Sequence, residues 1–379
     1  MRHFTQKGIP MNWFSVDKAG LAAVLERRGK FFAVAELVAN AWDSGTDRVE
    51  VSLVPIEGIP FAVLTVEDMG EGFSDLSHSH TMFARSSRGE DPSKRGRFML
   101  GEKLVLACCR SAGIESTCGS IQFSADGVKR HTLGRAVGTR FEAEIRMTRD
   151  EFSDVCDRML HLIPPVRTTF NGVEIDRPDS IARFDVKLPT EIADTDGLLR
   201  RTVRTATVEV YEATDGGELL ELGIPVVELD AGYRVNVLQK IPLNMDRDNV
   251  NPGFVRAIQA ALLNHVHEQL TPDEAAKPWA QEAAGDARAS RAAVKSIIKT
   301  RFGDHAVIAT PGDPVANARA EAAGFTVIPG GALSGDLWAN IKKNDVLLPS
   351  SKVFPTPRPD QVAAQREGAG TCPTCGRSF

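Results

Sequence analysis

Residues 36–43 have the sequence ELVANAWD, and residues 68–73 have the sequence DMGEGF. Glu36, Asn40 and Asp43 are spaced i, i+4 and i+7, so in a helix all three side chains project from one face. The apolar residues between them lie off that line and can pack against a sheet. One helix face therefore carries a carboxylate, an amide and a second carboxylate, and an Asp-x-Gly-x-Gly turn follows later in the chain.

Two apolar segments frame this pattern. Residues 61–66 (FAVLTV) predict a strand that leads directly into Asp68, and residues 49–53 (VEVSL) alternate as its partner strand. This flanking pattern argues against a simpler interpretation, in which Glu36 and Asn40 form a solvent-facing stripe and the glycines after Asp68 only make a hairpin turn.

Two further motifs follow along the chain. Residues 96–103 (GRFMLGEK) are glycine-rich, and residues 138–141 (GTRF) place a Gly-Thr pair before a strand. Together the four motifs resemble, in order and spacing, those of the gyrase, heat-shock chaperone, histidine kinase and mismatch-repair ATPases, the GHKL family, which has the Bergerat fold. The middle glycine of the family's lid is replaced here by Met99 or Leu100. Four motifs in order are far more specific than one Asp-x-Gly-x-Gly string, which also occurs in simple turns.

The resemblance implies a role for each matching residue. Glu36 would take a proton from the attacking water, and Asn40 would give one side-chain oxygen to a magnesium ion on the phosphates. Asp68 would accept a hydrogen bond from the adenine amino group, and Thr139 would support that contact. Asp43 has two interpretations: it tunes Asn40 or a metal-bound water, or it caps the end of the helix.

The glycines and the lid complete the expected ATP site. Gly70 and Gly72 would let the backbone approach the base closely. Backbone N–H groups from Gly96 to Gly101 would cradle the phosphates at the start of a helix. Lys103 either adds a positive charge there or is a solvated helix residue.

The segment from 78 to 97 is a long polar loop of the kind that forms a lid. Its basic residues either meet phosphates or DNA, or belong to a solvated loop. They are Arg85, Arg88, Lys94, Arg95 and Arg97.

Composition is that of an ordinary globular chain of 379 residues, with 42% hydrophobic and 25% charged residues. The net charge of -5 gives no global signal for nucleic acid. No apolar run reaches the length of a membrane span, and the N-terminus lacks the apolar stretch of a signal peptide. We therefore expect no membrane association, a cytoplasmic location, and six cysteines that are reduced thiols.

We expect an α+β protein with an ATP-binding α/β sandwich at the N-terminus. The predicted divisions are residues 1–165 for the GHKL ATP-binding domain, 166–270 for a transducer-like domain, 271–300 for a helical linker, 301–354 for a small α/β unit of unassigned role, and 355–379 for a Pro-rich tether and Cys-x-x-Cys tail. The strands and helix of the second region resemble the transducer domain that follows the ATP domain in topoisomerases, mismatch-repair proteins and heat-shock chaperones.

Local patterns in these later regions predict individual elements. Residues 166–175 predict a hairpin with an Asn-Gly turn, and residues 206–212 and 234–238 predict further strands. Residues 252–269 predict an amphipathic helix. In the small α/β unit we expect a strand, a helix and a second strand between 306 and 328, and a third strand at 345–348.

Residues 239–249 (QKIPLNMDRDN) resemble two segments of the family that reach the terminal phosphate across a domain boundary. Lys240 matches the lysine of the gyrase type, and Arg247 matches the arginine of the chaperone type. Either cation would stabilise charge on the transferring group. The alternative is that both are surface charges beside acidic neighbours.

The C-terminal tail contains Cys372-Pro-Thr-Cys375, the spacing of a zinc knuckle. A single pair of cysteines cannot complete four ligands, so two subunits would share one zinc ion or a histidine such as His305 would contribute. The alternative is a tail with free thiols.

Two functions from different classes remain. The first is a slow ATPase acting as a clamp on DNA, in which ATP binding makes a homodimer and hydrolysis reopens it; basic residues and the Cys-x-x-Cys pair favour it. The second is a chaperone-like or regulatory ATPase that acts on a protein client. A histidine kinase is disfavoured because no histidine lies in a dimerisation hairpin before the ATP domain. A complete topoisomerase is disfavoured because the tyrosines Tyr211 and Tyr233 lie in or directly beside predicted strands.

Overall fold

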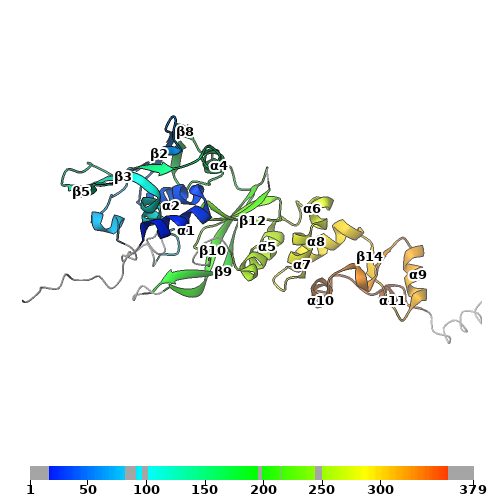
Figure 1. Ribbon diagram of the computed structural model, residues 1–379. Coiled ribbons are helices and arrows are strands. Elements are labelled where there is room, and N and C mark those ends of the chain that lie inside the picture. Colours follow the sequence, from blue (N-terminus) through cyan, green and yellow to red (C-terminus); the bar gives the residue numbers. More distant parts are fainter. Residues whose placement is uncertain are drawn as a thin grey trace, which may run out of the picture. The chain divides into compact units, whose positions relative to one another are not determined.

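The computed structural model describes residues 17–81, 91–95, 101–194, 199–214, 216–243 and 250–356. The chain divides into two compact units (Figure 1). One runs to Leu229 and includes Tyr233–Asn251, and the other comprises Asp230–Gly232 and the chain from Pro252 onward. Helices and sheets occur in both, which confirms the α+β class.

The first unit contains an eight-stranded sheet, here called the first sheet. Its strand order is β5-β4-β3-β6-β2-β1-β7-β8. β1 and β2 pair antiparallel with Leu53 opposite Leu64, so the predicted strand before Asp68 and its partner are both confirmed. β1 pairs parallel with β7, and the other neighbours are antiparallel. The strands are β1 (Arg48–Pro55), β2 (Phe61–Asp68), β3 (Cys109–Ser116), β4 (Gly119–Ser124), β5 (Gly127–His131), β6 (Thr139–Arg146), β7 (Arg167–Phe170) and β8 (Val173–Glu174).

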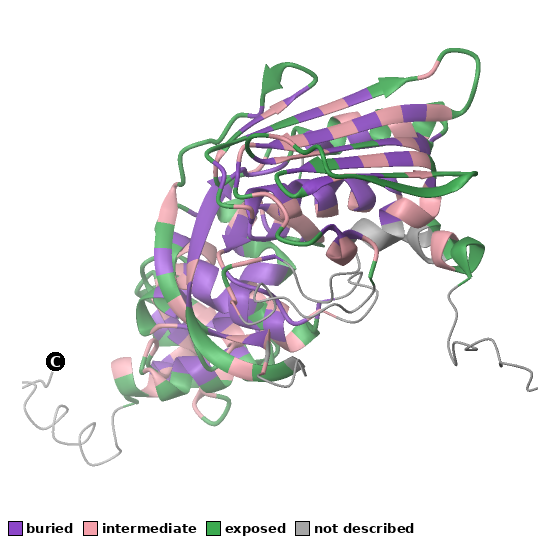
Figure 2. Ribbon diagram, turned by 90° about the vertical axis from the view of Figure 1, so that its left-hand side faces the viewer, coloured by how far each residue is buried: buried purple, intermediate pink, exposed green. Residues whose placement is uncertain are grey.

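Four helices lie on one face of the first sheet, and none of the helices in the described ranges covers the other face (Figures 1 and 2). They are α1 (Lys18–Arg28), α2 (Lys30–Trp42), α3 (Gly101–Cys108) and α4 (Arg149–Met159). α2 is the predicted motif helix, and its Val34 and Val38 are fully buried with Leu64 of β2. α4 starts with a capping box between Thr148 and Glu151. A short 3-10 turn, η1, spans Leu76–Ser79.

A five-stranded second sheet completes this unit, with the order β12-β11-β13-β10-β9. Its strands are β9 (Ala182–Ala193), β10 (Leu199–Glu212), β11 (Gly217–Glu221), β12 (Ile224–Leu229) and β13 (Tyr233–Val237), so both predicted strands are confirmed. The predicted hairpin at 166–175 also forms, with positive φ at Asn171 and Gly172. Because β7 pairs with β1, however, this hairpin belongs to the first sheet, and the second sheet starts only at β9.

The first helix of the second unit is α5 (Pro252–Val266), the predicted amphipathic helix, which therefore does not belong to the preceding domain as predicted. Residues 271–300 form α6 (Pro272–Ala276), α7 (Pro278–Gly285) and most of α8 (Arg291–Phe302). The segment is helical, as predicted, but Trp279 and Ile297 are almost wholly buried, so it is a packed core rather than a linker.

The small α/β unit contains β14 (Ala306–Ile308), α9 (Pro314–Ala322) and β15 (Thr326–Ile328), with the two strands parallel. The expected third strand does not form, since residues 345–348 are irregular and Ile308 makes only an isolated bridge to Pro349. A 3-10 turn, η3 (Gly330–Ala332), and helices α10 (Gly335–Lys343) and α11 (Ser350–Val353) follow.

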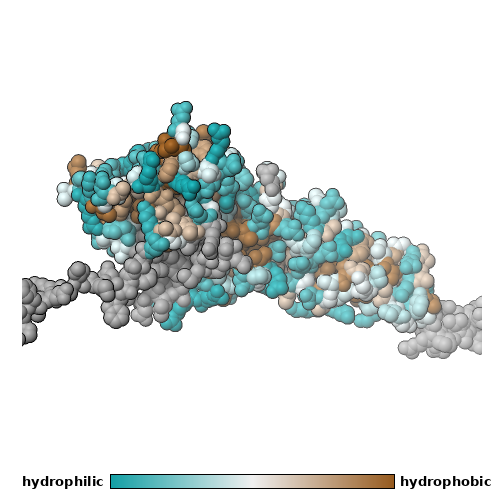
Figure 3. Space-filling model, in the orientation of Figure 1, coloured by the Kyte–Doolittle hydropathy of each residue, from teal (hydrophilic) through white to brown (hydrophobic). Residues whose placement is uncertain are grey.

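Hydrophilic residues cover most of the surface drawn in Figure 3, as the charged composition predicts. None of the helices in the described ranges has the length and apolar content that a membrane span requires. The cysteines of the described ranges, Cys108, Cys109, Cys118 and Cys156, are free thiols, as expected.

Burial of Cys109 makes the free energy of unfolding depend on pH in alkaline solution. Burial, with the neighbouring Cys108 second, raises the pKa of this thiol from 9.0 to about 12. The unfolded chain ionises Cys109 above pH 9 while the folded chain keeps it protonated, so stability is complete below pH 9 and falls as pH rises toward 12. We expect urea unfolding to show a loss approaching about 1.4 kcal/mol per pH unit from this group.

Two cysteine variants separate this effect from general alkaline damage. Cys109→Ala should show a shallower decline above pH 9, whereas Cys118→Ala, which removes an exposed thiol, should decline like the wild type. Burial also raises the pKa of Tyr211 to about 12, so some dependence will persist in both variants. If the free energy of unfolding falls with pH at the same slope in Cys109→Ala and the wild type, the effect does not come from Cys109.

Candidate functional site

The predicted polar residues meet where β2 ends. Asp68 is the last residue of β2, and the residue opposite it on the neighbouring strand β6 is Thr139. The Asp68 side chain is buried, and its Oδ1 atom accepts hydrogen bonds from Ser44 Oγ at 3.0 Å and from the Gly70 N–H at 2.8 Å. Two hydrogen bonds, one from the segment after α2 and one from the turn after β2, therefore hold this carboxylate in one orientation.

The glycines after Asp68 allow the turn to pack against its neighbours. A Cβ atom at Gly70 would overlap both the side chain and the carbonyl of Ser44, and one at Gly72 would overlap Thr117. Gly72 also has a φ of +77°, a conformation that side chains disfavour. Packing within the protein is therefore one reason for glycine at both positions, in addition to the approach to a base that the resemblance implies.

A serine that the sequence did not single out completes this end of the sheet. Ser116 is the last residue of β3 and pairs with Thr139 of β6. Its hydroxyl lies 3.1 Å from Thr139 Oγ1 and accepts a hydrogen bond from the Phe73 N–H at 2.7 Å. Sequence spacing carries no signal for Ser116, because only strand pairing brings it to Thr139. Ser44 had a local signal, since it directly follows the motif helix.

Asn40 and Asp68 line the same pocket, together with Ser44, Gly72 and Thr139. The structure thus brings four predicted site residues together from α2, β2, the following turn and β6. The cavity volume is about 50 Å³, enough for a few water molecules and below the roughly 300–1,000 Å³ of typical ligand pockets. A bound base would therefore have to widen it. Glu36 lies one helical turn before Asn40 on α2 and is half-buried.

Asp43 occupies the end of α2, the position that the capping interpretation gave it. Its carboxylate is buried and binds Arg95, with the Arg95 N–H donating to Oδ2 at 2.7 Å and Nη1 donating to Oδ1 at 3.0 Å. Burial lowers the pKa of the Arg95 guanidinium, and the Asp43 charge opposes that shift. Arg95, one of the five basic residues of the long loop, therefore has protein groups as its partners.

Lys240 is fully buried, so the surface-charge alternative is wrong for this residue. Its Nζ atom donates a hydrogen bond to the Asp91 carbonyl at 2.8 Å, and its backbone N–H donates to the Pro92 carbonyl at 2.9 Å. Lys240 follows β13 of the second sheet, whereas residues 91–95 directly precede the glycine-rich motif. The second sheet thus places a buried ammonium group against the segment that leads into that motif.

Several predicted residues lie wholly or partly beyond the described structure. Gly96, Arg247, Cys372 and Cys375 fall outside the described residues. Gly101 is the first residue of α3, and Lys103 lies in the same helix, although its side chain is not described. Within the described ranges, no group of three or more His, Cys, Asp or Glu residues could hold a metal ion.

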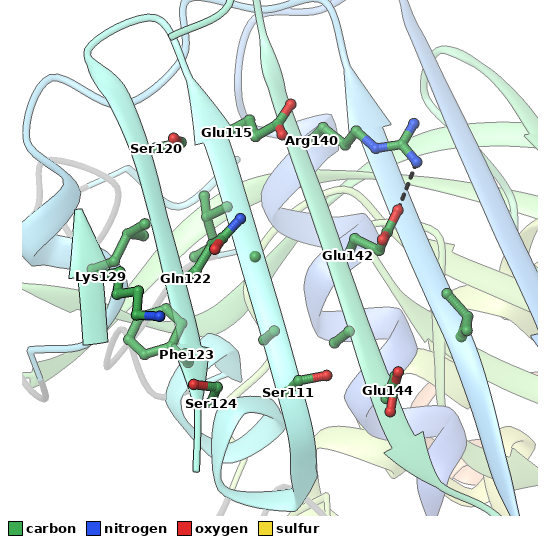
Figure 4. Close-up of a pocket in the computed structure, with 16 residues that line it drawn as sticks. Ser111, Glu115, Ser120, Gln122, Phe123, Ser124, Lys129, Arg140, Glu142 and Glu144 are labelled. Carbon is green, nitrogen blue, oxygen red and sulfur yellow. Dashed lines mark hydrogen bonds and ion pairs between the residues drawn. The ribbon is translucent and has the colours of Figure 1, made fainter. Parts of the chain in front are cut away.

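A larger hollow of about 330 Å³ lies elsewhere, over β3, β4 and β6 (Figure 4). Polar side chains such as Gln122, Glu115 and Lys129 line it, and its Glu142 pairs with Arg140 at 2.7 Å. None of the predicted site residues lies in this hollow. Neither a protein-family model nor a curated protein matches the chain. The functional interpretation of this chain therefore rests on the motifs and on the geometry at the end of β2.

Proposed function

We propose that this chain is a magnesium-dependent ATPase of the GHKL type, with the Bergerat fold, that hydrolyses ATP slowly. The observation that carries the proposal is the convergence of Asn40, Asp68 and Thr139 on one pocket. The amide oxygen of Asn40 suits a magnesium ion on the phosphates, and the carboxylate of Asp68 suits the adenine amino group. The hydroxyl of Thr139 suits a hydrogen bond that supports this second contact.

The arrangement of these residues supports a division of roles. Asp68 is held by Ser44 and Gly70 through one oxygen, so its carboxylate is oriented before any ligand arrives. Asn40 would help to hold a magnesium ion, which neutralises phosphate charge when bound. Glu36, one helical turn away, would accept the proton of the attacking water.

The architecture around the site agrees with the same family. A mixed sheet covered by helices on one face is a two-layer sandwich of the expected kind, and a second sheet follows it in the same unit. Lys240, which follows β13 of this second sheet, contacts residues 91 and 92, next to the expected lid. This contact supports the transducer-like role of the second sheet and makes Lys240 a candidate sensor of the terminal phosphate.

We further propose that ATP binding dimerises the protein into a clamp and that its partner is DNA. The exposed edge strand β5 carries Lys129, Arg130 and His131 in succession, with Lys129 and His131 on one face and Arg130 on the other, which makes this edge locally basic in a chain of net charge -5. Clusters of this kind bind phosphate backbones through salt-sensitive electrostatics.

The deciding experiment is ATP turnover by the purified protein with and without duplex DNA, at 50 and 200 mM salt. We expect turnover that DNA stimulates, with the stimulation lost at high salt. Turnover that is indifferent to DNA would favour a protein client instead. A protein that neither binds nor hydrolyses ATP would refute the proposed function.

A further inference from the structure

Arg95 joins the end of α2 to the second sheet. Its guanidinium donates from Nη1 to Asp43, and from Nε at 2.9 Å and Nη2 to the carbonyl of Leu222, in the turn between β11 and β12. The same guanidinium lies 4.8 Å from the ring centroid of Trp42, the last residue of α2. One buried cation thus contacts two elements that are far apart in the sequence.

The turn that Arg95 reaches has a strained backbone. Leu222 has a φ of +52° and Gly223 a φ of +90°. Glycine adopts this conformation readily, but leucine does so at a cost. The Leu222 N–H donates to the Val237 carbonyl at 3.0 Å and the Gly223 N–H donates to Asn236 Oδ1 at 2.8 Å, so surrounding groups hold the turn in place.

A buried arginine is retained only when its donors are satisfied, because leaving the charge without partners costs much more than the pair contributes. Asp43 lies three residues after Asn40 on the same helix end. A ligand that moves this end of α2 changes the Arg95–Asp43 contact, and the planar guanidinium carries that change to the Leu222 carbonyl. The contact is therefore a physical link between the pocket and the second sheet.

We propose that Arg95 is a positioning residue that couples nucleotide occupancy of the pocket to the Leu222–Gly223 turn of the second sheet. This inference rests on the proposed function, since it concerns the regulation of the same site. Coupling of this kind is reciprocal, so the state of the turn also changes nucleotide affinity.

Hydrogen exchange of the full-length protein tests the link, with residues 219–229 followed in the presence and absence of a non-hydrolysable ATP analogue. In the wild type, we expect the analogue to change exchange in this segment at least about fivefold. In Arg95→Lys the ammonium can still pair with Asp43 but cannot also reach the Leu222 carbonyl as the guanidinium does. This variant should still bind the analogue while the exchange response is lost.

Two further variants keep the test decisive. Arg167→Lys changes an exposed arginine paired with Glu174 and should respond like the wild type. Asp43→Asn keeps the shape of the side chain and removes its charge, so it should also lose the response, and it replaces Arg95→Lys if that variant does not fold.

The outcomes separate this inference from the function on which it rests. A full exchange response in Arg95→Lys would overturn it, as would wild-type protein that binds the analogue without any change at residues 219–229. Failure of the wild type to bind the analogue would instead refute the proposed function, and the coupling with it.

Discussion

Glu36→Ala is expected to abolish most ATP turnover while leaving ATP binding nearly intact. Glu36 lies one helical turn before Asn40 and is not among the residues that line the pocket, so its loss should not disturb the contacts around Asp68. A positioned general base contributes about 10²–10⁴-fold to rate, and we expect the loss in kcat to fall in that range. Single-turnover hydrolysis and equilibrium binding of ATP, measured on the same preparation, give the two quantities separately.

Glu50→Ala is the matched control, because Glu50 is an exposed carboxylate on β1 of the same sheet. It should hydrolyse ATP at the wild-type rate. Turnover by Glu36→Ala within a few-fold of the control would remove Glu36 from the reaction. Loss of binding together with turnover would show that Glu36 holds the nucleotide rather than the water.

Asp68→Asn is expected to weaken ATP binding by about 10- to 100-fold and to change which base the pocket prefers. Asn keeps an Oδ1 atom to accept from Ser44 and Gly70, so the turn should survive. The amide replaces the second carboxylate oxygen with a donor, which cannot accept a bond from the adenine amino group. A hydrogen bond to a charged group is worth about 1.5–3 kcal/mol, and this sets the expected size.

Inosine triphosphate makes the test specific, because its base has a carbonyl where adenine has the amino group. The wild type should prefer ATP, and Asp68→Asn should lose or reverse that preference in calorimetric titrations. Asp126→Asn, in the exposed turn between β4 and β5, should bind both nucleotides as the wild type does. An unchanged ratio of the two affinities in Asp68→Asn would mean that Asp68 does not read the base.

The core of the candidate site was predictable because its signals are local. The spacing of Glu36 and Asn40 predicts one helix face, and α2 places both residues there. The apolar run before Asp68 predicts a strand, and β2 ends at that residue. Helical and strand periodicities depend on near neighbours in the chain, so a sequence can carry them without knowledge of the fold.

The division of the chain was harder to predict. The hairpin at 166–175 has a clear turn signal, but its place in the first sheet depends on the parallel pairing of β7 with β1, more than a hundred residues earlier. The helices after residue 270 look like a linker because proline and glycine interrupt them. Buried residues such as Trp279 make them a core, and burial depends on contacts with distant elements.

By itself, the sequence of this protein determined the elements that carry Asn40, Asp68 and Thr139, since periodicity and turn chemistry act over a few residues. Only the tertiary structure decided the partners of these elements. Ser116 meets Thr139 through strand pairing, Arg95 binds both Asp43 and Leu222, and the ammonium of Lys240 is buried against Asp91. Such contacts join residues 23 to 149 positions apart, and the chain brings them together only when its strands pair into the two sheets and the helices pack.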